Sequence, residues 1–291
     1  MKRKKNLAEI TFNIFNFLFM ATAVIVCLYP LWYVLIASFS GASAVTTGKV
    51  MFWIKDFNVE AYKKAFEQPY MGVSYLNTIY YALVGTVLSM VLTVVGAYPL
   101  SKKRLNGRKF MTLFTTFTMW FSAGMLPNFI MFRTYGLLDT RLGVLLQGAV
   151  STFYVIIMRT AFESVPDSLE ESMKIDGASD FQILIHTYLP LTVPTLMTLT
   201  LYYFVMRWNS YFWPMILLST ETKVPLQVVL KKLVVDMSGL FENSKEIDIS
   251  TMSKETIVYA TMVLAVAPML IIYPFIQKFF VKGIAVGAVK G

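Results

Sequence analysis

The stretch that decides the fold is SVPDSLEESMKIDGASDFQILIHTYLP, residues 164–190, which stands between two apolar segments. Ser164 suits a helix cap and Gly177 suits a helix stop, so this spacing predicts a short helix that ends at Gly177. Ser179 is the expected cap of a second short helix, which ends before Pro190. On local pattern alone, this pair of helices is as typical of a solvated connection as of a functional element.

The composition around this stretch indicates a membrane protein. The chain has 291 residues, of which 56% are hydrophobic and 15% charged, with a mean hydropathy of +0.60. Soluble globular proteins carry about 25% charged residues, so too little polar surface remains to cover a water-facing sphere. The net charge of +9 lies at the ends of apolar runs, as in Lys2-Arg3-Lys4-Lys5 and Lys102-Lys103-Arg104. This placement favours membrane topology over a nucleic-acid surface.

Uncharged windows predict six transmembrane helices, because about 20 apolar residues cross the hydrocarbon core. The predicted spans are residues 12–39, 76–100, 110–132, 142–158, 190–218 and 256–277. The fold class that follows is an all-α integral membrane protein with short helices between spans four and five. The first span is expected to be an anchor, since its apolar stretch is longer than the core of a signal peptide.

The basic flanks predict the orientation of these spans. The N-terminus, the loop 101–109 and the C-terminal tail are all basic, and with six spans they fall on one side. The positive-inside rule places that side in the cytoplasm, together with both termini and the loop 159–189. Residues 40–74, 133–141 and 219–255 are then expected outside.

Several classes of chemistry lack their residues in this sequence. The single cysteine, Cys27, excludes an intrachain disulfide, and the single histidine, His186, has no metal-ligand spacing around it. The nearest candidate for a phosphate-binding loop, Gly48-Lys49, is followed by Val50 and lacks the required earlier glycine. We therefore expect no catalytic residues, no bound metal and no cofactor, and ATP is expected on another chain.

The loop 164–190 resembles the hallmark loop of the membrane subunits of binding-protein-dependent ABC importers. That hallmark reads Glu-Ala-Ala, three residues, Gly, nine residues, Ile, one residue, Leu-Pro. At the same spacing this chain has Glu171-Ser172-Met173, Gly177, Thr187 and Leu189-Pro190. The resemblance implies a type I ABC importer permease, in which the loop is a coupling helix that docks in a cleft of the ATPase subunit. The ATPase-coupling residues that it implies are Glu170, Glu171, Lys174, Asp176, Gly177, Ala178 and Pro190.

Two further stretches resemble the sugar-importer branch of this family, which includes the second permease of the maltose system. They are Trp208-Asn209-Ser210-Tyr211-Phe212-Trp213-Pro214 and the C-terminal end, residues 280–291. In the maltose system such a tail reaches into the ATPase dimer, and the resemblance implies the same contact here. The expected division is an N-terminal tail, first span and outer loop (1–70), an importer transmembrane domain (71–280) and a cytoplasmic tail (281–291).

The translocation pathway is expected to involve Arg207, Trp208, Asn209 and Tyr211. Arg207 is either a pathway residue or, by the interpretation that we favour, an arginine that extends to the outer membrane surface. The aromatic residues are suited to stacking on sugar rings and equally to an interfacial belt. For Asn209, gating and hydrogen bonding between helices are equally consistent.

The function predicted from these features is that of a permease subunit of an ATP-driven importer for a sugar or oligosaccharide. The expected partners are a second homologous permease, two ATPase subunits, an extracellular solute-binding protein and membrane lipid, with no nucleic acid. The expected location is the inner membrane of a bacterium. The alternatives are a permease for another solute class (amino acid, polyamine or inorganic anion) and a secondary transporter, for which internal repeats are expected and none is found. A membrane enzyme is disfavoured, since the spans are nearly free of His, Asp and Glu.

Overall fold

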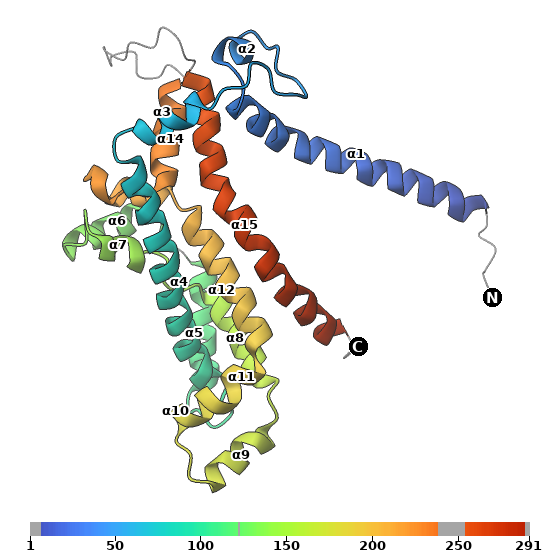
Figure 1. The fold of residues 1–291 in the computed structure, drawn as a ribbon. Helices are drawn as coiled ribbons and strands as arrows, with labels where there is room; N and C mark the ends of the chain where they lie inside the picture. The colour runs from blue at the N-terminus through green and yellow to red at the C-terminus, as the bar shows by residue number, and fades with distance from the viewer. Residues whose placement is uncertain (1–6, 122, 238–253, 289–291) are drawn as a thin grey trace. The chain divides into compact units, whose positions relative to one another are not determined.

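The computed structural model describes residues 7–121, 123–237 and 254–288, and every element in these ranges is a helix (Figure 1). The predicted all-α class is thereby confirmed for the described part of the chain. The elements are α1 (Leu7–Ser38), α2 (Ala42–Thr46), α3 (Glu60–Glu67), α4 (Met71–Ser101), α5 (Arg108–Trp120), α6 (Met125–Thr134), α7 (Arg141–Leu146), α8 (Thr152–Glu163), α9 (Asp167–Ile175), α10 (Asp180–Ile183), the π-helix η1 (Leu184–Tyr188), α11 (Leu189–Leu191), α12 (Val193–Trp208), α13 (Phe212–Leu217), the 3-10 helix η2 (Glu221–Lys223), α14 (Leu226–Met237) and α15 (Lys254–Ala288).

The chain forms two compact units. The first comprises the described residues of Met1–Pro69 and Lys232–Ala267, and the second comprises those of Tyr70–Lys231 and Pro268–Gly291. The division predicted at residues 70 and 280 stays a prediction. The basic run at residues 2–5 and the final part of the predicted tail, 289–291, lie outside the described residues.

The first unit is built on the last turns of α1. Ile36 and Ala37 pack with Ala44 and Val45 of α2 in a small buried cluster. The rest of α1 is apolar and exposed, and residues 11–38 have a mean hydropathy of 2.1 with none of the test window buried. A long apolar helix that buries so little of itself needs lipid or another chain around it.

The core of the second unit lies where α4 packs against α12 and α8 (Figure 1). The buried face of α4 consists largely of small or hydroxyl residues, namely Ser74, Thr78, Ala82, Gly85, Ser89, Thr93 and Ala97. Side chains this small let helix backbones approach closely, which is how helices associate in a membrane. The hydroxyls are satisfied inside the bundle in several cases, as for Thr93, whose Oγ1 lies 2.7 Å from the Tyr203 hydroxyl.

The third, fourth and fifth predicted spans are not continuous helices, so this part of the prediction was wrong. The window 110–132 is divided between α5 and α6, which begins after Gly124 at a φ of +80°. The window 142–158 is divided between α7 and α8, with Gly148 at a φ of +63°. Positive φ is open chiefly to glycine and ends a helix. The window 190–218 ends its main helix at Trp208 and resumes in the short helix α13.

Among the described residues, two helices are long and apolar enough to cross a membrane alone. They are residues 11–38 of α1 and the whole of α4. A third span results if the bent pair Asp180–Leu191 and Val193–Trp208, which turns by 85°, counts as one. The sixth predicted span corresponds to α15, whose residues 255–271 are apolar and whose backbone helix continues to Ala288.

Arg207 joins the interrupted fourth span to α12. Its side chain is buried and donates to the carbonyl oxygens of Val144 (3.0 Å), Leu145 (3.0 Å) and Gln147 (2.8 Å). These carbonyls belong to the end of α7, where a helix leaves its last carbonyls without partners. The interpretation that Arg207 extends to the membrane surface was therefore wrong, because unpaired carbonyls inside the bundle offer the guanidinium a closer set of acceptors.

The buried side chain of Arg207 fits beside α4 because residue 85 is a glycine. A Cβ atom at position 85 would lie 3.0 Å from Nε and 3.1 Å from Cδ of Arg207. The small residue on α4 thus makes room for the long side chain of α12. The small residues along α4 therefore accommodate Arg207, the charged residue of the apolar helix α12.

We expect Arg207→Met to destabilise the protein, because it keeps an unbranched stem and removes every donor to the three carbonyls. Each buried polar group left unpaired costs about 1–3 kcal/mol, so a clear loss in thermal unfolding temperature is expected for the purified complex. The matched control is Arg133→Met, which removes an exposed arginine from α6. Equal unfolding temperatures for the two variants would contradict the structural role.

Candidate functional site

The short helix α9 lies at one end of the second unit, with α6 and α7 at the other (Figure 1). It ends in a Schellman motif: the N–H of Gly177 donates to the carbonyl of Lys174 (3.0 Å) and that of Ala178 to Met173 (2.9 Å). Gly177 has a φ of +79° and open space around its Cβ position. Glycine is therefore needed for its backbone conformation rather than for lack of room, and the predicted helix stop is confirmed.

The start of α9 differs from the prediction. Ser164 ends α8, and its hydroxyl donates back to the carbonyl of Ala161 (2.7 Å). Pro166 is the residue before α9, which has no side-chain cap. Ser179, in contrast, caps α10 as expected, in a reciprocal pair with Gln182 whose Oε1 accepts from the Ser179 N–H at 2.8 Å. The serine chosen as the first cap was wrong because its hydroxyl satisfies a carbonyl of the preceding helix.

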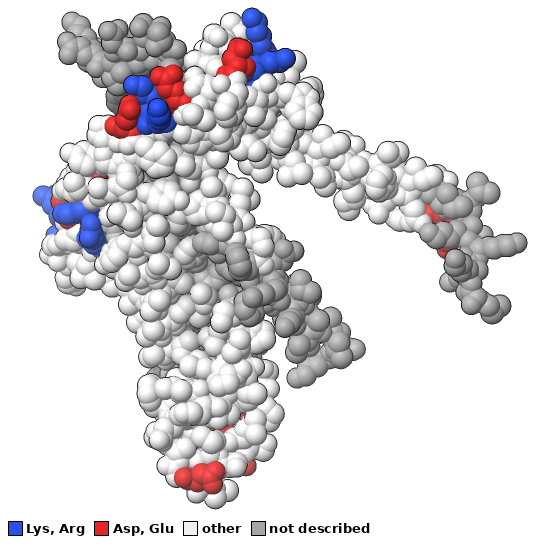
Figure 2. Space-filling view, in the orientation of Figure 1, with Lys and Arg blue, Asp and Glu red and all other residues white. Residues whose placement is uncertain are grey.

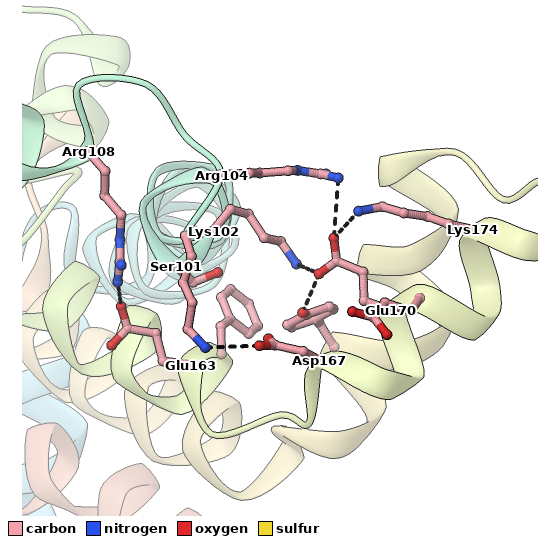
Figure 3. Close-up of a pocket in the computed structure, with 12 residues that line it drawn as sticks. Ser101, Lys102, Arg104, Arg108, Glu163, Asp167, Glu170 and Lys174 are labelled. Atoms are coloured by element: carbon pink, nitrogen blue, oxygen red, sulfur yellow. Dashed lines mark hydrogen bonds and ion pairs between the residues drawn. The ribbon is translucent and has the colours of Figure 1, made fainter.

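Glu170 is the centre of the site (Figure 3). Its carboxylate accepts from Lys102 Nζ (2.6 Å), Tyr188 Oη (2.7 Å) and Lys174 Nζ (2.6 Å), and Arg104 lies 3.5 Å away. Only 10% of the Glu170 side chain is exposed. These partners come from the end of α4, from η1 and from α9 itself, so one carboxylate joins α9 to the nearby η1 and to the end of α4, which is far away in sequence.

The electrostatics of this carboxylate favour its charged form. Burial by itself raises the pKa of Glu170, but the hydrogen bonds from Lys102, Lys174 and Tyr188 outweigh it and lower the pKa to about 2. The Lys102 ammonium also lies over the rings of Tyr188 (3.5 Å to the centroid) and Tyr98 (4.2 Å). A cation that is held by both a carboxylate and two aromatic faces has little freedom to leave.

Around Glu170 the structure forms a polar cleft of about 370 Å³ (Figure 3). Its rim carries further ion pairs, Lys103 with Asp167 at 2.9 Å and Arg108 with Glu163. The lining residues are Ser101, Lys102, Lys103, Arg104, Arg108, Phe162, Glu163, Asp167, Glu170, Glu171, Lys174 and Tyr188. The basic run after α4 therefore meets the acidic helix α9 face to face.

The outward face of α9 has a different character. Glu171 and Asp176 are exposed, and so is Ile175, 87% of whose surface is accessible. Acidic side chains are visible at this end of the molecule in Figure 2. An exposed apolar side chain rimmed by polar ones is suited to contact with another protein.

The predicted coupling residues thus fall into three groups, apart from Pro190. Glu170 and Lys174 form part of the internal ion-pair cluster. Glu171 and Asp176 are exposed, with Glu171 at the edge of the cleft, and Gly177 and Ala178 end the helix. Pro190 lies in α11, at the bend into α12. Sequence reasoning missed Lys102 and Tyr188 as partners of Glu170, and it missed the exposed Ile175. The signal available for Lys102 was its place in a basic run that directly follows a span.

The predicted pathway residues are separated by the structure. Trp208 is buried and packs against Phe204 and Tyr75 (ring centroids 6.0 and 6.3 Å apart), so it has no face open to a sugar in this conformation. Asn209 is exposed, and its Nδ2 donates to the carbonyl of Val205 within α12 (3.0 Å). Tyr211 is exposed. Roles of these residues and of Arg207 in a pathway stay predictions.

Metal chemistry has no support in the described ranges, where no group of three or more His, Cys, Asp or Glu side chains is arranged to hold an ion. The absence of a cofactor stays a prediction.

The low pKa of Glu170 gives a testable pH dependence. A carboxyl group whose pKa is lowered on folding stabilises the fold fully above its ordinary value of 4.5 and loses this contribution as pH falls toward about 2. We expect the difference in unfolding temperature between the unaltered protein and Glu170→Gln to be constant from pH 8 to about pH 5, and to narrow only at lower pH. A difference that already narrows between pH 7 and pH 5 would contradict the assignment.

Comparison with known proteins places the chain in a family. A family model described as binding-protein-dependent transport system inner membrane component matches residues 85–286. The chain is 36% identical over 281 residues to the polygalacturonan/rhamnogalacturonan transport system permease protein YtcP of Bacillus subtilis (strain 168), a match that covers 96% of this chain and 98% of that protein. It is 26% identical to the lactose transport system permease protein LacG of Rhizobium radiobacter, over 96% of each chain.

Solved structures agree with these relatives. A chain in the crystal structure of a bacterial ABC transporter involved in the import of the acidic polysaccharide alginate matches with a TM-score of 0.88 and 40% identity, over 96% of this chain and all of that one. A second match, at 15% identity and a TM-score of 0.60, shows the fold alone. The chain therefore belongs to the family of inner membrane components of binding-protein-dependent transport systems, and it is a type I ABC importer permease.

Proposed function

We propose that this permease imports an acidic oligosaccharide, and that α9 couples the transport path to ATP hydrolysis on a separate subunit. The observation that carries the coupling role is the buried carboxylate of Glu170, which ties α9 to α4 and to η1 through hydrogen bonds of 2.6–2.7 Å. When a partner displaces the exposed face of a helix whose other face is bound to the bundle, the displacement is transmitted to the bundle.

Two sets of residues on α9 have different roles in this coupling. The exposed residues Glu171, Asp176 and Ile175 form the docking surface for the ATPase subunit, with Glu171 at the edge of the cleft. The inward residue Glu170 transfers displacement to Lys102 at the end of α4 and to Tyr188, which leads through α11 into α12. Because α4 and α12 pack along their length, a movement that starts at α9 reaches the core of the transport unit.

The remaining partners follow from the family. A binding-protein-dependent system implies an extracellular solute-binding protein, a second permease and two ATPase subunits that hold the ATP. The basic segments next to the predicted spans support an orientation with α9 and both termini in the cytoplasm. In this arrangement the permease itself performs no chemistry, and the C-terminal tail contacts the ATPase pair.

The substrate class is supported by the relatives. Polygalacturonan, rhamnogalacturonan and alginate, which appear in the names of two of them, all contain sugars that carry a carboxylate, and these two are more similar to this chain than the lactose permease is. We infer an oligosaccharide of uronic acids rather than a neutral sugar.

The substrate assignment is tested with the complete transporter, reconstituted in vesicles with its binding protein. We expect ATP-driven uptake of a labelled galacturonan oligosaccharide and little uptake of a neutral malto-oligosaccharide of the same length. Preferential uptake of the neutral sugar would contradict the substrate class. Uptake without ATP or without the ATPase subunits would instead indicate a secondary transporter.

The division of roles on α9 makes a separate prediction. Glu171→Lys is expected to abolish uptake with the subunits still inserted, because it reverses a charge on the docking surface. Glu170→Gln is expected to leave the ATPase subunits bound and to lower the sugar transported per ATP hydrolysed, because the helix loses its anchor. The control is Glu60→Lys, an exposed charge reversal on α3. A normal amount of sugar transported per ATP hydrolysed by Glu170→Gln would refute the coupling role of Glu170.

A further inference from the structure

A second cavity lies between α5 and α8, next to the cleft around Glu170, which we call the coupling cleft. It has a volume of about 330 Å³ and is lined by Arg108, Lys109, Thr112, Leu113, Thr116 and Arg159. Arg108 lines both this cavity and the coupling cleft, so the two adjoin at the same end of the second unit. None of these residues was singled out for function by the sequence.

The cavity has an excess of positive charge. Arg108 and Arg159 share one carboxylate, that of Glu163, to which Arg159 Nε donates at 2.8 Å. Lys109 is a third cation, so the lining of the cavity carries three cations and no carboxylate, and two of these cations share Glu163. Such an excess attracts an anion, and the low dielectric of an apolar surround strengthens the attraction.

The surface below these cations is apolar. No residue of α5 is buried, and its side chains Leu113 and Trp120 are 70% and 82% exposed. These two residues are seven apart, so they share with Lys109 one side of the helix, with the lysine at the end nearer the coupling cleft. This side of α5 therefore has cations at one end and exposed apolar side chains along the rest.

We propose that this cavity binds the headgroup of an anionic phospholipid, with an acyl chain lying along Leu113 and Trp120. Basic pockets between membrane helices on one leaflet are the recognised setting for acidic lipid headgroups. An anionic headgroup supplies the missing negative charge, and its chain covers the apolar side of α5.

The contacts favour a lipid over the carboxylate of a transported sugar. Of the two hydroxyls in the cavity, Thr116 already donates to the carbonyl of Thr112 (2.8 Å), and the Thr112 hydroxyl accepts from Arg159 Nη1 (3.1 Å). A saccharide presents many hydroxyl groups, which exposed leucine and tryptophan side chains do not satisfy. A headgroup needs only the cations.

The test uses the complete transporter, purified and equilibrated with equal amounts of phosphatidylglycerol and phosphatidylcholine. Retained lipids are counted by native mass spectrometry. We expect an excess of phosphatidylglycerol that falls roughly fivefold in Lys109→Gln, which corresponds to the loss of one basic residue near a headgroup. Lys109→Arg should restore the excess, and thermal unfolding checks that each variant is folded.

Lys103→Gln is the matched control, because it removes the same charge from the neighbouring loop while its partner is Asp167 in the coupling cleft. It should leave the phosphatidylglycerol excess unchanged. Equal retention in the unaltered protein, Lys109→Gln and Lys109→Glu overturns the proposal. Displacement of phosphatidylglycerol by a galacturonan oligosaccharide, lost in Lys109→Gln, also overturns it and assigns the cavity to the substrate. The readout is bound lipid, so it is independent of whether acidic sugars are transported.

Discussion

A buried carboxylate requires partners, and the need to satisfy Glu170 organises the coupling end of this permease. An unpaired charge in so enclosed a position is far too costly to keep, so the lysine after α4 and the hydroxyl of η1 must both be present for α9 to take its place. The same contacts leave the opposite face of α9 exposed. Rigidity inside and accessibility outside are therefore two results of one interaction, and a coupling element needs both.

The same rule operates in the interior of the bundle. Arg207 satisfies carbonyls at the interrupted fourth span, and the stripe of small residues on α4 makes room for it. At the far end of the second unit, Asp139 accepts hydrogen bonds from Thr220 and Lys223, which hold its pKa below the usual range and fasten the loop before α7 to the segment after α13. Broken helices in a membrane protein need such substitutes for the backbone bonds they lose.

The exposed apolar surfaces complete this picture. Most of α1 and one side of α5 are apolar and exposed in the described part of the chain, as expected for a subunit that works between lipid and other chains. Cations at the cleft end of α5 then mark where an apolar surface gives way to a charged one. A bound anionic lipid there would place the membrane surface directly beside the coupling cleft. Arg108, which pairs with Glu163, lines both the cleft and the lipid cavity.

Much of this architecture is written in the sequence itself. Hydropathy determined the all-α membrane class, because apolar runs are local properties, and the spacing from Glu171 through Gly177 to Pro190 resembles the hallmark of the family to which the chain belongs. Local pattern also identified the cap at Ser179. It failed at the continuous spans, since a short apolar window does not reveal where glycines with positive φ interrupt it. Only the tertiary structure decided that Glu170 is buried while Glu171 stays exposed at the edge of the cleft, and that Arg207 is an internal donor rather than a surface charge. These outcomes depend on acceptors and donors more than sixty residues away, which fold to the same point and have no signature in the neighbouring sequence.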